Sequence, residues 1–136
     1  MKDPKELIDY LRGIPAFLRK QKELTGVTVE ARIEGQGVEI VKPGIIVMLS
    51  APQSAYGRVG ALQWPVTIFA LPDHKAEWMD EVTEGLRLLK HVTDILQFSD
   101  YRALQLDPQQ PVTFVQSIPG NSVYAVQLLT PFTLAV

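Results

Sequence analysis

A stripe of hydrophobic residues at spacings of three and four runs from residue 78 to residue 96, and it constrains the fold more than any other feature. Such spacing is typical of one face of an α-helix, here about six turns long. Asp73 is a good N-cap residue, so a helix is predicted over residues 73–96. Gly85 lies on the stripe and is expected to let another element approach closely. The stripe itself comprises Trp78, Met79, Val82, Leu86, Leu89, Val92 and Leu96.

The segments on both sides of this helix show the period-two pattern of β-strands. Residues 64–71 are apolar on both faces, which favours a central strand. Ile118-Pro119-Gly120-Asn121 is a strong hairpin signal between the last two strands. Strands are predicted at residues 27–33, 38–41, 45–49, 64–71, 101–106, 112–117 and 122–132.

An N-terminal amphipathic helix precedes the strands and is interrupted near its middle. Its apolar stripe contains Gly13 and Pro15, which predict a kink or a break into two helices. The order of elements is helix, strands, long loop, strand, long helix, strands. This order predicts an α+β fold, with a mostly antiparallel sheet packed against one long helix and an N-terminal helix. We expect one α+β domain over residues 1–136.

Composition excludes several classes of function. The net charge is −2, without the basic patch that nucleic-acid recognition requires. The chain has no cysteine, so disulfides, thiolate nucleophiles and cysteine-ligated zinc are excluded. Its longest apolar runs are far shorter than the roughly 18 residues of a membrane span. We therefore expect a cytoplasmic protein with no membrane or nucleic-acid partner.

The two histidines are the first candidates for catalytic or metal chemistry, since the carboxylate pairs of the long helix are ordinary surface charges. Asp73 beside His74 is the kind of pair that orients a general base, but capping of the long helix explains the same residues. His91 shares a helix face with Glu84 and Asp94, while Arg87 on that face would oppose a metal ion. No nucleophile motif or phosphate-binding glycine loop accompanies them. The sequence therefore predicts no enzyme, no cofactor and no metal.

A long loop is predicted at residues 50–63, because this stretch has little periodicity and contains Pro52, Gly57 and Gly60. Loops of this length in a compact domain are often functional. Residues 53–63 are therefore the candidate contact segment for another protein chain. The candidate interface residues, in this segment and at its junction with the next strand, are Tyr56, Arg58, Val59, Leu62 and Trp64.

The layout of the elements resembles that of the small tail-terminator, or tail-completion, proteins of tailed bacteriophages and prophages. The resemblance covers nearly the whole chain and is carried by the order of elements rather than by a short motif. The elements that carry it are the helix 4–22, the strands 27–33 and 45–49, the loop 56–62, the strand 65–71, the helix 73–96 and the strands 112–117 and 123–134.

This resemblance implies a structural protein that forms a ring, typically a hexamer. Such a ring caps the tail tube, stops its growth and joins it to the head-completion protein. The implied partners are further copies of the chain, the tail-tube protein and the head-completion protein. The implied location is the cytoplasm of a bacterial host and then the virion or prophage-derived particle.

Two other classes of function stay open at this point. One is a small peptide- or ligand-binding module with a groove between the long helix and the sheet. The other is a small enzyme that uses Asp73, His74 or His91 in a cleft. Replacing either histidine with alanine would abolish activity in an enzyme and would be nearly silent in an assembly protein.

Overall fold

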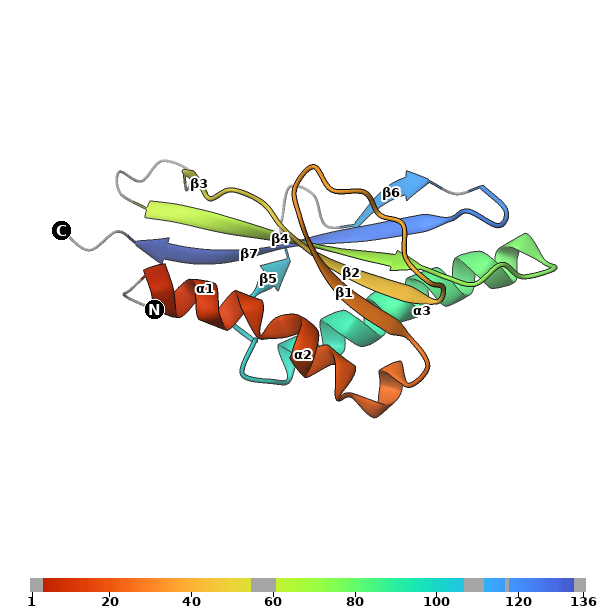
Figure 1. The fold of residues 1–136 in the computed structure, drawn as a ribbon, viewed down its shortest axis with the longest axis horizontal. Helices are drawn as coiled ribbons and strands as arrows, with labels where there is room; N and C mark the ends of the chain where they lie inside the picture. The colour runs from red at the N-terminus through yellow and green to blue at the C-terminus, as the bar shows by residue number, and fades with distance from the viewer. Residues whose placement is uncertain (1–3, 55–60, 107–111, 117, 134–136) are drawn as a thin grey trace.

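The structure is a computed structural model that describes residues 4–54, 61–106, 112–116 and 118–133. Within them, seven strands form a mixed sheet in the order β1-β2-β4-β7-β5, with β3 beside β4 and β6 beside β7 (Figure 1). Only the β1–β2 pair is parallel among the described pairs. The strands are β1 (Thr28–Ile33), β2 (Gly44–Leu49), β3 (Gln53–Ser54), β4 (Ala61–Leu71), β5 (Gln105–Leu106), β6 (Val112–Gln116) and β7 (Val123–Thr133).

The helices lie along one face of this sheet (Figure 1). They are α1 (Pro4–Arg12), α2 (Ile14–Arg19), the 3₁₀ turn η1 (Lys22–Leu24) and α3 (Trp78–Gln97). The predicted interruption of the N-terminal helix is confirmed, because α1 ends before Gly13 and Pro15 stands at the start of α2. Proline is tolerated there because the first N–H groups of a helix have no partner within it. The α+β fold class, with a long helix and an N-terminal helix on the sheet, is also confirmed.

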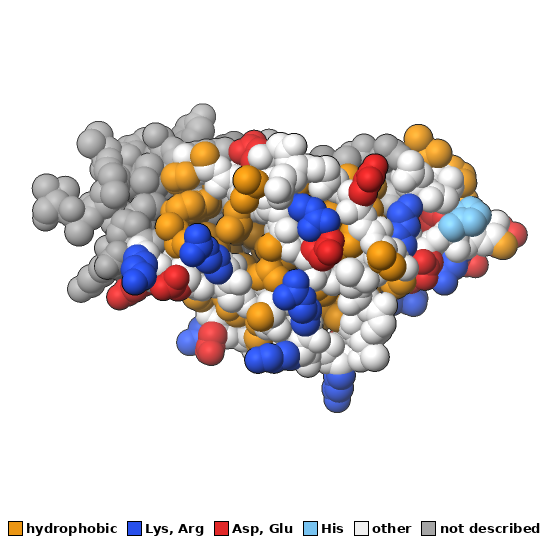
Figure 2. All heavy atoms as spheres, in the orientation of Figure 1, with side chains coloured by type: hydrophobic (Ala, Val, Ile, Leu, Met, Phe, Trp, Pro, Cys, Tyr) orange, Lys and Arg blue, Asp and Glu red, His pale blue; other side chains and the backbone are white. Residues whose placement is uncertain are grey.

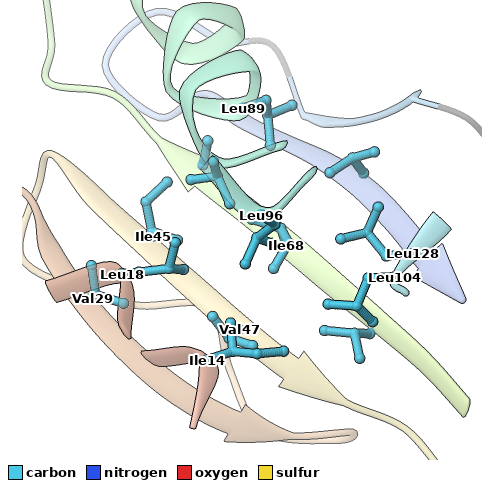
Figure 3. Packing of buried hydrophobic residues seen from close by; sticks show 14 of the residues in the cluster. Ile14, Leu18, Val29, Ile45, Val47, Ile68, Leu89, Leu96, Leu104 and Leu128 are labelled. Atoms are coloured by element: carbon cyan, nitrogen blue, oxygen red, sulfur yellow. The ribbon is translucent and has the colours of Figure 1, made fainter. Parts of the chain in front are cut away.

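The main hydrophobic core fills the space between the helices and the sheet. Figure 3 shows Ile14 and Leu18 from α2 and Leu96 from α3 among side chains from the strands. A second, smaller cluster lies on the other face of the sheet and contains Ile46 and Met48. The central strand β4 contributes to both clusters, as its two apolar faces predict.

The long helix starts later than predicted. Its N-cap is Glu77 rather than Asp73, so residues 73–77 precede α3 without regular secondary structure. The buried side of α3 is also rotated relative to the predicted stripe, and Trp78, Met79 and Leu86 are exposed. The true buried positions are Glu81, Gly85, Leu88, Leu89, Val92 and Leu96. Two of these positions hold Glu81 and Gly85, so a search for hydrophobic spacing could not identify this face.

Two predictions between β1 and β4 are wrong. Residues 38–41 form no strand; β1 and β2 are parallel, so residues 34–43 return the chain from one end of the sheet to the other. Val38 and Ile40 pack on the second cluster, and their apolar character serves that contact. The predicted loop over residues 50–63 is interrupted by β3. This strand pairs with β4, which begins at Ala61 and is therefore longer at its start than predicted.

The remaining strand predictions hold with shorter bounds. The hairpin of β6 and β7 is confirmed, with a bulge between Phe114 and Gln116. The strand expected at 101–106 is limited to β5, because residues 101–104 form a turn closed by a hydrogen bond from Leu104 N to Tyr101 O. In β1, Val29 is buried, while Ala31 and Ile33, which alternate with it on the same face, are exposed. β1 is an edge strand, and the helices cover only its first half.

Candidate functional site

The predicted interface residues fall into two groups. Tyr56, Arg58 and Val59 lie outside the described residues. Leu62 and Trp64 belong to β4, where Leu62 pairs with Ser54 of β3 and with Phe132 of β7. Trp64 is half-buried, and its indole Nε1 donates a hydrogen bond to the carbonyl oxygen of Ser50 at 2.6 Å. This bond fixes the indole against the segment that connects β2 to β3.

Trp64 lines a largely apolar groove of about 480 Å³, which we call the Trp64 groove. It lies between α1, the ends of β1 and β2, and the first half of β4. In Figure 2, hydrophobic side chains lie exposed among charged ones in the half of the molecule that contains α1. The groove is lined by Ile8, Leu11, Arg12, Ile33, Glu34, Leu49, Ser50, Ala51 and Trp64.

Local sequence patterns explain how these side chains meet. Ile8 and Leu11 are three residues apart on α1 and therefore share a helix face. Ile33 and Leu49 are partners in the parallel register of β1 and β2, so they lie side by side. Leu49 and Trp64 pack on the main core, whereas Ile33 is 63% exposed. The groove thus has a fixed floor and one large apolar side chain exposed at its edge.

The rim of the groove carries one charge of each sign. Arg12 ends α1 and Glu34 follows β1, and both side chains are exposed. Arg12 forms no ion pair with any residue that the structure describes. An exposed guanidinium beside an apolar groove is a residue type favoured at protein interfaces.

The outer edge of β1 is capped by side chains of its own chain. Arg19 Nε donates to Val29 O at 2.9 Å, and Arg32 Nη1 donates to Ala31 O at 3.1 Å. The amide of Ile33 donates to Gln36 Oε1 at 2.9 Å. Capping of this kind blocks an edge strand from pairing with a strand of another chain. A partner at this end of the sheet therefore has side chains to contact rather than a free backbone edge.

A second polar arrangement surrounds Glu81, whose side chain is fully buried. Its Oε1 lies 3.0 Å from His74 Nδ1 and accepts a hydrogen bond from Gly120 N at 2.9 Å. Its Oε2 accepts a hydrogen bond from the Ser122 hydroxyl. Burial raises the pKa of this carboxyl, but the hydrogen bonds from Ser122, Gly120, His74 and the Lys75 backbone outweigh burial and lower the pKa to about 2. Glu81 is therefore ionised at neutral pH.

This arrangement differs from a nucleophile triad. In a triad the imidazole lies between the hydroxyl and the carboxylate and takes the hydroxyl proton. Here the carboxylate of Glu81 lies in the middle, so Ser122 donates to Glu81 and has no hydrogen bond to His74. The sequence prediction that His74 opens the long helix beside a capping Asp73 is wrong, because both residues precede α3. The cluster joins α3 to the β6–β7 turn.

The carboxylates predicted beside His91 are engaged by lysines. Lys75 Nζ lies 3.3 Å from Glu84 Oε2, and Lys90 Nζ lies 2.7 Å from Asp94 Oδ2. Within the described part of the chain, no three His, Asp or Glu side chains cluster closely enough to hold a metal ion. His91 instead lies where two hollows of about 540 and 420 Å³ meet along α3, and both hollows also include Glu23 of η1.

Ser122 and Gly120 were not predicted as partners of Glu81. The sequence marks residues 118–121 as a turn, but it contains no signal that this turn meets a helix 39 residues away. Glu81 itself gave no hint either, because it follows Asp80 in an acidic stretch and a glutamate is ordinarily a solvent-exposed residue.

Comparison with models of known protein families finds no match, and comparison with curated proteins finds no relative. Among the helices that the structure describes, none combines the length and hydropathy needed to cross a lipid bilayer.

Proposed function

We propose that this protein is a structural assembly protein, with a role similar to that of the tail terminators that its order of elements resembles. Its copies associate into a ring that caps a tail tube and offers a surface to a head-completion protein. It carries out no catalysis, and it resides in the bacterial cytoplasm before it joins the particle. The observation that carries this proposal is the Trp64 groove, an apolar surface that Trp64 lines together with Ser50 and Ala51.

The composition of the groove supports contact with another protein chain. Tryptophan and arginine are enriched among the residues that contribute most of the binding energy of protein interfaces, and both line this groove. The hydrogen bond from Trp64 to Ser50 holds the indole in place before any partner arrives. A side chain that is already ordered loses little conformational entropy on binding.

The capped edge of β1 supports a contact through side chains rather than through sheet extension. Pairing with a foreign strand would require Arg19 and Gln36 to leave Val29 and Ile33. Insertion of a partner's side chains into the Trp64 groove leaves these bonds intact. The proposed contact is therefore compatible with a sheet that is already complete at this edge.

The test is the solution mass, measured by light scattering after size exclusion over a concentration series. We expect a species of several 15.2 kDa subunits for the wild type. Ile33→Glu puts a charge into the groove and is expected to shift the population to monomer. Phe98→Glu is the matched control, since Phe98 is 86% exposed and lies outside the groove. A wild-type monomer at every concentration would overturn the proposal.

A small peptide-binding module is the second candidate, favoured by the two joined hollows along α3. They share Glu23 and His91, and one of them is bordered by Phe17 and Phe98. A surface with aromatic residues at one end and charges at the other suits an extended peptide. This function predicts a stable monomer, and Phe98→Glu rather than Ile33→Glu would impair it. The same pair of variants therefore separates the two candidates.

A further inference from the structure

A second exposed apolar surface lies at the end of the molecule where α3 begins. Trp78 and Met79 in the first turn of α3 are 42% and 61% exposed, and Ile118 in the β6–β7 turn is 57% exposed. Figure 1 places the start of α3 and this turn at the same end of the long axis, and Figure 2 shows hydrophobic side chains there. We call these three residues the α3 tip.

The Glu81 cluster holds the two parts of the tip together. Glu81 is one turn after Trp78 on α3, and its carboxylate accepts hydrogen bonds from Gly120 and Ser122 in and beside the turn. Lys42 Nζ donates a hydrogen bond to Gly120 O at 3.1 Å. The tip is thus fixed by polar contacts, although its own apolar side chains face solvent. Such preorganisation lowers the entropic cost of binding.

The acidic charges of the tip match one side of the rim of the Trp64 groove, the side that carries Arg12. Glu77 and Asp80 flank Trp78 and Met79, and both are exposed. Neither carboxylate forms an ion pair within the described residues, and the same is true of Arg12 on the rim of the groove. An apolar surface bordered by two acidic groups therefore fits the Arg12 side of the groove, whereas Glu34 on the same rim has the same sign as the tip.

We propose that the α3 tip of one copy docks into the Trp64 groove of the next copy. This docking depends on the self-association in the proposed function and names the two surfaces that meet. The groove volume of about 480 Å³ is on the scale of small-ligand pockets, roughly 300–1,000 Å³, and suits a few side chains. The two surfaces are different parts of the chain, so the contact is heterologous.

A heterologous contact repeats from copy to copy. Each copy that uses its tip still has a free groove, so assembly continues until the rotation between neighbours closes a ring. In Figure 1 the tip lies at one end of the long axis, and α1 and the start of β4 lie toward the other. One tip and one groove per copy suffice for a ring. A two-fold contact of tip with tip would stop at a dimer.

Cysteine cross-linking tests this contact directly, because the chain contains no cysteine. Met79→Cys marks the tip, Ala51→Cys marks the groove, and Ala16→Cys on the exposed side of α2 is the control. The variants are mixed in pairs at low concentration, concentrated, oxidised and analysed on a non-reducing gel, with light scattering of the same samples.

We expect a cross-linked dimer from Met79→Cys mixed with Ala51→Cys, at least fivefold above either variant alone and above mixtures with Ala16→Cys. An oligomer in which Met79→Cys cross-links with itself, or in which the mixture does not exceed the control, overturns the docking mode but leaves the proposed assembly function standing. Monomers in every sample, without cross-links, overturn both. A double variant carrying both cysteines should give a ladder of cross-linked species.

Discussion

At the residue scale, Glu81 is the least expected member of the buried side of α3. A buried carboxylate is costly unless donors surround it, and here the donors come from two sequence-distant segments, around His74 and around Gly120 and Ser122. Because the hydrogen bonds favour the ionised form, Glu81 stabilises the native state only while it is charged. The cluster therefore couples the attachment of the β6–β7 turn to pH.

The first prediction concerns this coupling. The folded pKa of about 2 lies below the ordinary value of 4.5, so the stabilisation by Glu81 is complete above pH 4.5 and is lost as the pH falls toward 2. Glu81→Gln should lower the free energy of unfolding by about 1–3 kcal/mol at pH 7, because an amide cannot accept all of these hydrogen bonds. The difference between variant and wild type should shrink between pH 4.5 and pH 2 in urea unfolding.

Glu77→Gln is the control for this experiment. Glu77 is exposed, one turn away on the same chain segment, and removing its charge should change stability by less than about 0.5 kcal/mol. A loss of stability in Glu81→Gln that stays constant down to pH 2 would contradict the role assigned to the ionised carboxylate.

At the element scale, α3 packs on the sheet through Gly85. A methyl group at this position would overlap the ring of Tyr124, which is fully buried in β7, and would also approach Pro72. The sequence prediction that Gly85 permits a close approach is confirmed by this contact. The glycine lowers the helix propensity of α3, and the close packing of α3 on β7 offsets that cost.

The second prediction follows from this contact. Gly85→Ala should destabilise the fold by about 1–3 kcal/mol through overpacking, although alanine favours a helix by about 1 kcal/mol. Gly37→Ala is the matched control, because a side chain there would meet no atom within 4 Å. Urea unfolding of both variants gives the comparison. Equal stability of Gly85→Ala and wild type would mean that α3 and β7 are less tightly packed than described.

Most elements were predictable because their signals are local. Hydrophobic spacing identified α3 and the central strand β4, and turn residues identified the β6–β7 hairpin. The start of α3 and its buried side were not predictable, because they depend on which residues of the helix the sheet covers. Trp78 is apolar and fits the helical stripe, yet it lies beyond that cover and is exposed. The parallel pairing of β1 with β2 was not predictable either. A helix usually connects two parallel strands, but here residues 34–43 return the chain without one.

At the scale of the whole molecule, the candidate site depends on segments that the sequence keeps apart. Trp64 was predicted as an interface residue, but the groove also needs Ile8 from α1 and Ile33 from β1. No local pattern connects these three residues, because only the packing of α1 on the sheet brings them together. The α3 tip likewise joins the first turn of α3 to a turn about 40 residues later.

The last prediction tests whether the charges of the tip and the groove meet. If Asp80 of one copy approaches Arg12 of the next, Arg12→Glu and Asp80→Arg should each weaken self-association by about three- to tenfold, since an exposed attractive pair contributes about 0.2–1 kcal/mol and becomes repulsive. The double variant restores opposite charges across the contact and should recover most of the affinity. Dissociation constants from concentration-dependent light scattering at low salt provide the measurement. If the losses of the two single variants simply add in the double variant, Arg12 and Asp80 do not face each other. Salt screens a true ion pair, so the dissociation constants of all four proteins should become more similar at high salt.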